Sequence, residues 1–296
     1  MNTIINTDIT QAARLLAAGE IVGIPTETVY GLAANALNPA AINKIFEAKG
    51  RPRDNPLIVH VSDMEMVHGL GLEVSGLAEK LTKKFWAGSL TIVLKKIKDI
   101  IPAEVSCRLD TVAVRTPAHP VAMELIKICG FPLAAPSANI SGSPSPTRAE
   151  HVMADMNGKI PLILDGGRCD VGVESTVIML DGDRIRVLRP GAVTLEMLAE
   201  FGEVVIDDNG SLHSPGTRHK HYSPRAEVIA VEGDVTGMGG YIINDPSPQT
   251  LYAMLREFDE AGAEKIFIRL PRPDGIGLAL YNRIVRAAEF KIIKVE

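Results

Sequence analysis

The sequence lacks the common motifs for phosphate, dinucleotide, metal and acyl-transfer chemistry. Its 296 residues contain no GxxxxGK[ST] phosphate loop, no complete GxGxxG turn, no HExxH helix and no GxSxG nucleophile elbow. These absences argue against a P-loop ATPase, a Rossmann dehydrogenase, a zinc peptidase and a serine hydrolase. Any chemistry must therefore depend on residues outside these motifs.

Cysteines and long apolar runs are also scarce. Cys107, Cys129 and Cys169 are odd in number and form no CxxC unit, so we expect reduced thiols rather than disulfides or a zinc site. The longest apolar runs, such as residues 90–94, are far too short to cross a bilayer. Residues 1–7 have neither a basic start nor a signal-type apolar core. We expect a cytoplasmic protein with no membrane contact.

The composition is that of an ordinary globular protein. Hydrophobic residues make up 46%, charged residues 23% and aromatic residues 4%, and the apolar residues are mostly Ala, Val, Ile and Leu. This mixture favours buried strands alternating with helices, the α/β pattern. The net charge of −5 argues against wrapping nucleic acid with the whole surface, although the lysines of residues 83–84 and 95–98 could form a local basic patch. Solvated charge is the more common meaning of such short runs.

Apolar periodicity and turn signals divide the chain into alternating elements. The turn Asp181-Gly182-Asp183 between two apolar runs predicts a hairpin, and Thr10 and Gly19 predict the start and stop of a first helix. Helices are predicted over residues 11–18, 39 to about 50, 75–85, 119–129, 148–156, 195–201, 249–261 and 278–288. Strands are predicted over residues 20–25, 57–61, 90–95, 112–115, 133–135, 162–164, 176–180, 184–188, 228–231, 241–244, 265–270 and 291–295.

The chain length allows two domains, because single domains cluster near about 100–150 residues. Residues 207–225 are rich in Asp, Asn, Gly, Ser, Pro and His and have almost no apolar periodicity, which is typical of a linker. We therefore predict a first domain over residues 1–206 and a small α/β domain over residues 226–296. His219 and His221 lie in the linker without a nearby Cys or acidic ligand set, so no protein metal site is expected.

Two polar loops follow predicted strands or helices. Residues 49–56 place Lys49, Arg51 and an amide after a helix, and residues 136–142 present hydroxyls and Asn139 after a strand. Lys49 and Arg51 could simply complement the helix dipole, and the second loop could be an ordinary polar turn. Because α/β proteins bind ligands at the carboxyl ends of strands, the two loops can instead converge on an anion. The pattern alone predicts an anion-binding α/β protein.

Several segments resemble the YrdC-like family in order and spacing over about the first 200 residues. They are residues 25–32 (PTETVYGL), 49–51 (KGR), 55–57 (NPL), 137–139 (SAN), 172–176 (GVEST) and 188–191 (LRPG). Residues 214–216 (SPG) and 219–224 (HKHYSP) resemble the linker of the longer, two-domain threonylcarbamoyl-adenylate synthases, and the tail resembles a shortened form of their C-terminal domain. The resemblance implies a YrdC/RibB-like twisted open sheet with flanking helices, followed by a small Rossmann-like α/β domain.

The resemblance also implies a reaction. L-threonine and bicarbonate form a carbamate, whose oxygen attacks the α-phosphorus of ATP and releases pyrophosphate. This is the first step of the threonylcarbamoyladenosine modification of tRNA, so the implied partner is a downstream tRNA threonylcarbamoyl transferase complex, with a weak contact to tRNA or double-stranded RNA. Because one anion attacks another, the site needs fixed positive charge. Mg²⁺ is expected with ATP, held mainly by phosphates and water.

The family's site residues can be placed on this sequence by motif. Lys49 and Arg51 match the catalytic cations, and Arg115 is the expected two-point partner of the threonine carboxylate. The linker is expected to act as a lid over the nucleotide. The implied ATP-binding residues are Arg51, Asn55, Thr111, Ser137, Asn139, Ser145, Arg189, His221 and Tyr222. The implied threonine-binding residues are Thr28, His60, Arg115, Ala135 and Ser175.

Four of these residues also have a structural explanation. Thr111 and Arg115 alternate on a strand and could face solvent, Ser175 could cap a turn, and His60 could be a hydrogen-bonded core residue. Two other functions stay open. A non-catalytic RNA-binding module would share a basic concave face, and the carbamoyl-transfer branch of the superfamily would handle carbamoyl-adenylate. The acidic net charge counts mildly against the first, and the missing acylphosphatase-like and zinc-finger segments count against the second.

Overall fold

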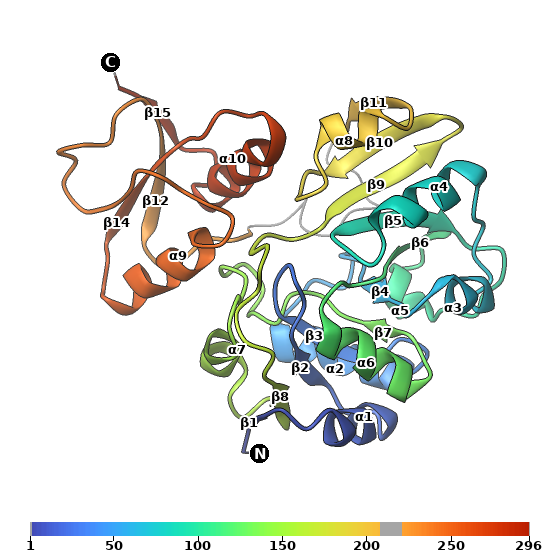
Figure 1. Cartoon of the computed structure of the whole chain (residues 1–296). Helices are drawn as coiled ribbons and strands as arrows, with labels where there is room; N and C mark the ends of the chain where they lie inside the picture. Colours follow the sequence, from blue (N-terminus) through green and yellow to red (C-terminus); the bar gives the residue numbers. More distant parts are fainter. Residues whose placement is uncertain (1, 208–220, 296) are drawn as a thin grey trace.

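The computed structural model describes residues 2–207 and 221–295, and this part of the chain forms two β-sheets (Figure 1). The larger sheet has eleven strands in the order β1-β8-β2-β3-β7-β4-β6-β5-β9-β10-β11. These are β1 (Ile4–Asn6), β2 (Val22–Ile24), β3 (Gly31–Asn35), β4 (Ile58–His60), β5 (Leu90–Lys95), β6 (Thr111–Arg115), β7 (Leu133–Ala134), β8 (Leu162–Leu164), β9 (Thr176–Asp181), β10 (Arg184–Arg189) and β11 (Glu203–Ile206).

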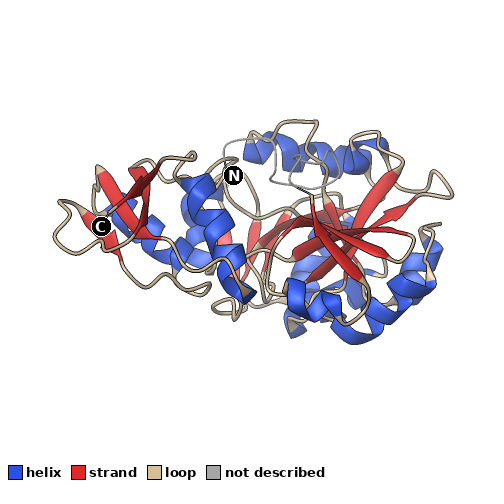
Figure 2. Cartoon of the chain, turned by 90° about the horizontal axis from the view of Figure 1, so that it is seen from above, coloured by secondary structure: helices blue, strands red, loops and turns tan. Residues whose placement is uncertain are grey.

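The smaller sheet is parallel, with the order β13-β14-β12-β15. Its strands are β12 (Glu227–Glu232), β13 (Tyr241–Ile243), β14 (Lys265–Arg269) and β15 (Ile292–Lys294). The helices α9 (Leu251–Glu260) and α10 (Gly275–Ala287) lie between this sheet and the rest of the molecule in both views (Figures 1 and 2). An ion pair between Arg256 of α9 and Asp155 joins the two parts at 2.7 Å.

The remaining helices flank the larger sheet, and several begin and end at the expected signals. Asn38 and Pro39 start α2 and Gly50 ends it in the left-handed conformation, while the Ser75 hydroxyl caps α4. The first helix starts earlier than predicted, because Asp8 rather than Thr10 accepts the capping hydrogen bond from the Gln11 amide. These helices are α1 (Ile9–Ala17), α2 (Pro39–Lys49), α3 (Met64–Gly69), α4 (Gly76–Phe85), α5 (Ala103–Ser106), α6 (Pro120–Cys129), α7 (Ala149–Met156) and α8 (Leu195–Ala199).

The two faces of the larger sheet are covered unequally near its centre. Successive side chains of a strand point to opposite faces, so Val59, Val112 and Val114 enter the main hydrophobic core. Their neighbours Ile58 and Ala113 point to the other face, where they form a small separate cluster with Val93, Val177 and Leu188. This second face carries little apolar cover and is where the polar residues described below gather.

The predicted α/β class and the predicted hairpin are confirmed, since β9 and β10 pair antiparallel. The strands β1, β3 and β11 and the helices α3 and α5 were not predicted. The most consequential omission is β3, because its sequence GLAAN looks like the end of a loop and has no β-branched residue. Residues 208–220 of the predicted linker and lid, including His219, lie outside the described residues.

Candidate active site

A pocket opens on the less covered face of the larger sheet, and the space within it, open solvent included, is about 600 Å³. Most of the predicted site residues line this pocket: Thr28, Arg51, His60, Arg115, Ala135, Ser137, Ser175, Arg189, His221 and Tyr222. The others, Lys49, Asn55, Thr111, Asn139 and Ser145, are not part of its lining.

The pocket lies over a face of the sheet, beside the last residues of β4, β6 and β10, which are His60, Arg115 and Arg189. Ile58 and His60, which alternate on β4, both line it, and His60 is paired in register with Arg115 of β6. The two predicted loops converge on this pocket, because Arg51 and Pro56 of the first and Pro136 and Ser137 of the second line it. The sheet itself is mixed, since β7 runs antiparallel to β4 and β5 runs antiparallel to β6.

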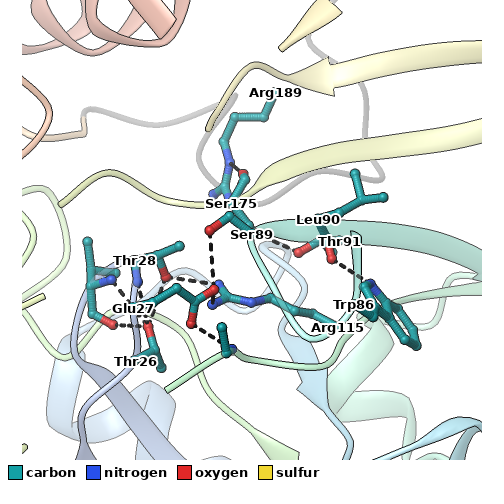
Figure 3. A network of polar contacts seen from close by, with 12 residues as sticks. Thr26, Glu27, Thr28, Trp86, Ser89, Leu90, Thr91, Arg115, Ser175 and Arg189 are labelled. Carbon is teal, nitrogen blue, oxygen red and sulfur yellow. Dashed lines mark hydrogen bonds and ion pairs between the residues drawn. The ribbon is translucent and has the colours of Figure 1, made fainter. Parts of the chain in front are cut away.

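A buried ion pair joins the pocket-lining residue Arg115 to Glu27 (Figure 3). One terminal guanidinium nitrogen of Arg115, Nη2, donates to Glu27 Oε1, and the other, Nη1, donates to Thr28 Oγ1 at 2.9 Å. Glu27 also accepts hydrogen bonds from Ser89 Oγ and the Ala118 amide. Arg115 is 3% exposed, and its Nε has no protein partner in the described part of the chain. Glu27 was missed as a site residue, although it lies within the PTETVYG segment.

The loop that carries Glu27 is held by its own threonines. Thr26 Oγ1 donates to the Val29 carbonyl at 2.6 Å and lies 2.9 Å from Thr28 Oγ1. This local bonding explains why short polar side chains precede β3. Ser175 also lines the pocket: its hydroxyl lies 2.7 Å from Thr91 Oγ1, and its carbonyl accepts a hydrogen bond from Arg189 Nη2 at 2.9 Å (Figure 3).

Lys49 lies beneath the pocket and anchors a neighbouring loop. The prediction that it sits on a polar loop is wrong, because it is the last residue of α2 and only 2% exposed. Its Nζ donates to the carbonyls of Ser137 and Asn139, both at 2.5 Å. Burial and then the nearby Arg51 hold the pKa of Lys49 well below its usual value. The two hydrogen bonds of Nζ fix the loop that carries two predicted ATP-binding residues.

Arg51 is buried at the rim of the pocket. Its Nε and Nη2 donate to the carbonyls of Asn55 and Pro56 at 3.1 and 2.9 Å. Burial lowers the pKa of Arg51 to about 10, so the guanidinium stays charged at neutral pH. Asn55 contributes its backbone to this arrangement, while its side chain is 4% exposed. The segment following α2 thus presents a fixed cation to the pocket.

Ser145 and Asn139 act on the pocket through their neighbours. Ser145 Oγ donates to Glu174 Oε1 at 2.6 Å, and Asn139 Nδ2 donates to the Ile140 and Ser143 carbonyls. Glu174 itself lines the pocket and was not predicted as a site residue. Burial alone would raise its pKa, but Arg283, Arg189 and the Ser145 hydrogen bond lower the pKa of Glu174 to about 2.

Two pocket histidines are held neutral. Burial, followed by the charge of Arg115, lowers the pKa of His60 to about 3. Burial, followed by Arg51, lowers the pKa of His221 to about 3. The His221 Nε2 atom is buried without a hydrogen-bond partner among the described residues. Each neutral ring has one nitrogen that donates and one that accepts a hydrogen bond, and it adds no charge to the site.

Thr111 shares a face with Arg115 but lies at the other end of β6. Four residues of strand span about 13 Å, and Ala113 of the small apolar cluster lies between them. Only an extended ligand lying along this face can contact Thr111 and Arg115 together.

The described residues contain no cluster of His, Cys, Asp and Glu that could hold a metal ion. No helix in the described ranges is long and apolar enough to span a membrane. The three cysteines are free. The site thus consists of buried arginines, hydroxyls, neutral histidines and two carboxylates, and its catalytic potential is electrostatic.

The fold and the pocket together place the protein in the class of α/β enzymes that have an open twisted sheet and bind anions through fixed cations. A family model for Sua5, YciO and YrdC proteins, described as "Telomere recombination", matches residues 14–191. A second model, "Threonylcarbamoyl-AMP synthase, C-terminal domain", matches residues 193–239 and 247–289. The chain therefore belongs to the Sua5/YciO/YrdC family, in its two-domain form.

Named relatives are similar over nearly their full length. A Threonylcarbamoyl-AMP synthase of Pyrococcus abyssi is 42% identical and covers 96% of this chain and 95% of its own, and one of Bacillus subtilis is 40% identical with 97% and 94% covered. The crystal structure of P. abyssi Sua5 complexed with L-threonine is 40% identical, with a TM-score of 0.92 over 100% of both chains. These matches confirm the predicted family and the predicted YrdC-like fold.

Proposed function

We propose that the chain is an L-threonylcarbamoyladenylate synthase, a nucleotidyltransferase. It joins L-threonine, bicarbonate and ATP into threonylcarbamoyl-AMP and releases pyrophosphate. The observation that carries this proposal is that one pocket is lined by the cations Arg51, Arg189 and Arg115 together with Thr28 and His60. The full-length similarity to proteins named for this activity, and to one solved with L-threonine, supports it.

We place threonine beside the pair of Arg115 and Glu27. The sequence suggested that the Arg115 fork grips the threonine carboxylate at two points, but its Nη atoms already donate to Glu27 and Thr28. The buried Nε and the remaining Nη protons are the donors available to a carboxylate. Glu27 balances the guanidinium charge, so the pair of Arg115 and Glu27 is itself neutral. Ala135, His60 and Ser175 complete this side of the proposed site.

We place the nucleotide on the side of Arg51 and Arg189. Phosphate oxygens need fixed cations and N–H donors, and both guanidinium groups are buried and held by carbonyls. An ATP molecule extended along the sheet face has the length to reach Thr111. Ser137, His221 and Tyr222 border the same side, with Lys49, Asn55, Asn139 and Ser145 supporting their loops. Mg²⁺ accompanies ATP and is held by phosphates and water.

The chemistry needs no nucleophile from the protein. The threonine amine and bicarbonate give a carbamate and water; a carbamate oxygen then bonds to the α-phosphorus as the bond to pyrophosphate breaks. The cations stabilise charge that moves onto the phosphate oxygens, a contribution of about 3–4 kcal/mol for one such donor. Neutral His60 and His221 avoid placing extra charge beside the carbamate.

Further assignments belong to the same proposal. We divide the chain into a catalytic domain over residues 1–206, a linker over residues 207–225 and a small domain over residues 226–296. The product is a mixed anhydride, so the implied consumer is a transferase complex that moves the threonylcarbamoyl group to tRNA. Direct contact with tRNA or double-stranded RNA is weak, as the net charge of −5 favours.

The test is a pyrophosphate assay with single omissions. Purified protein with ATP and Mg²⁺ should release pyrophosphate only when L-threonine and bicarbonate are both present. Release of ADP and phosphate, or turnover that ignores threonine, would exclude the proposed reaction. RNA binding with steep salt dependence and no turnover would favour the non-catalytic RNA-binding alternative.

A further inference from the structure

Arg283 of α10 is the largest fully buried side chain of the described residues, and it reaches from the small sheet's helices to the pocket wall. Its Nε donates to Glu174 Oε2 at 2.8 Å, and its Nη2 donates to the Pro190 carbonyl at 3.0 Å. Glu174 lines the pocket and precedes Ser175, while Pro190 follows Arg189. One side chain of α10 therefore contacts both segments that flank the proposed nucleotide side.

A second residue of the small part of the chain binds the same carboxylate. The Tyr252 hydroxyl of α9 donates to Glu174 Oε2 at 2.9 Å. With Ser145 on Oε1 and Arg283 on Oε2, Glu174 is held by three side chains from three segments. A buried ion pair is weak evidence for stability, because apolar replacements of similar volume are often as stable. The arrangement of the three side chains around Glu174 is therefore more informative than their contribution to stability.

The same two residues fix Tyr222. The Tyr222 ring stacks on Tyr252 with centroids 5.6 Å apart, and the Arg283 guanidinium carbon lies 5.3 Å from the Tyr222 ring centre. Tyr222 has a φ of 66°, a conformation that a bulky residue adopts only when its surroundings impose it. It borders the pocket beside His221, whose ring lies 5.4 Å away.

We propose that Arg283 and Tyr252 are positioning residues through which α9 and α10 set the affinity of the pocket for the nucleotide. They hold Tyr222 in a strained conformation and lock Glu174 onto Ser145. Neither residue bonds to Thr28, His60 or Arg115, and they reach the threonine side only through Ser175, which follows Glu174, so threonine affinity should depend on them much less than ATP affinity. The identification of the ligand as ATP rests on the proposed function, whereas the contacts described here would position any nucleoside triphosphate.

The test compares equilibrium binding of ATP and of L-threonine, each alone, to wild type and four variants. Tyr252→Leu removes the stack and the hydroxyl, Tyr252→Phe removes only the hydroxyl, and Arg283→Lys keeps the charge but loses the two-point contact. Glu257→Gln is the control, since its exposed 2.9 Å ion pair with Arg148 also joins the two parts of the chain but lies outside this cluster.

Tyr252→Leu and Arg283→Lys should weaken ATP binding about tenfold or more, because small displacements in a positioned site are costly. Threonine binding should stay within about twofold, Tyr252→Phe should retain most ATP affinity and Glu257→Gln all of it. If the Arg283→Lys protein does not fold, the ATP affinity of the Tyr252→Leu protein alone decides the test, because this substitution removes no charge. Equal losses for both ligands in folded Tyr252→Leu protein, or unchanged ATP binding, would overturn the proposal. Failure of the proposed function is read separately, as the absence of pyrophosphate release by the wild type.

Discussion

Lys49 could anchor the loop of residues 136–142 or act directly on the substrates, and replacing it by methionine distinguishes these two roles. Methionine keeps most of the aliphatic volume but removes the ammonium that binds the Ser137 and Asn139 carbonyls. Each buried carbonyl left without a donor costs about 1–3 kcal/mol. We therefore expect the free energy of unfolding to fall by about 2–6 kcal/mol, together with a large loss of ATP turnover as the loop of residues 136–142 loosens.

The assay is urea denaturation of Lys49→Met beside Lys44→Met, with turnover measured where both variants are folded. Lys44 is the matched control, because it lies on the same helix but its pair with Glu20 is about 40% exposed. An exposed pair contributes at most about 1 kcal/mol. If Lys49→Met unfolds at the wild-type urea concentration yet loses turnover a hundredfold or more, the loop-anchoring account is refuted, and the ammonium acts directly on the substrates.

Three further predictions concern substrate binding, pH and metal. Arg115→Lys should raise the KM for threonine with little change for ATP, since lysine lacks the planar fork that now holds Glu27 and Thr28; equal effects on both substrates would contradict this. The pKa of His60 is near 3 when folded and about 6.5 when unfolded, so its stability contribution is present above pH 6.5 and is lost as pH falls towards 3. Between pH 6.5 and 5 the free energy of unfolding of His60→Asn should therefore fall by about 2 kcal/mol less than that of the wild type, measured by denaturation at each pH. An equal fall in both proteins would contradict the burial argument. EDTA should abolish ATP turnover but leave threonine binding unchanged in calorimetry, and a loss of threonine binding would indicate a protein-bound metal.

Local signals in the sequence were sufficient for much of the fold. Asn38-Pro39, Gly50 and Ser75 mark helix ends because capping involves neighbouring residues only. The strand β3 was missed because its small residues carry no alternation, and only pairing with β2 and β7 makes it a strand. The Asp8 cap was missed because Thr10 is an equally good capping residue two positions later.

The candidate site was recognised from motifs more fully than from physical patterns. Most motif-matched residues line one pocket, but nothing local to the sequence signals the roles of Glu27 and Glu174. Each carboxylate is meaningful only beside a distant partner, Arg115 for Glu27 and Arg283 for Glu174. Lys49 was placed on a loop because the sequence cannot show that the following chain folds back over it. These contacts depend on tertiary packing, which periodicity does not encode.

The most direct test of the central claim is to follow the carbon of labelled bicarbonate. Protein incubated with ¹³C-bicarbonate, L-threonine, ATP and Mg²⁺ should yield a compound containing threonine, AMP and one labelled carbon, detected by mass spectrometry in amounts equal to the pyrophosphate released. AMP and pyrophosphate formed in equal amounts without any labelled adduct, when the products are quenched early, would contradict the account.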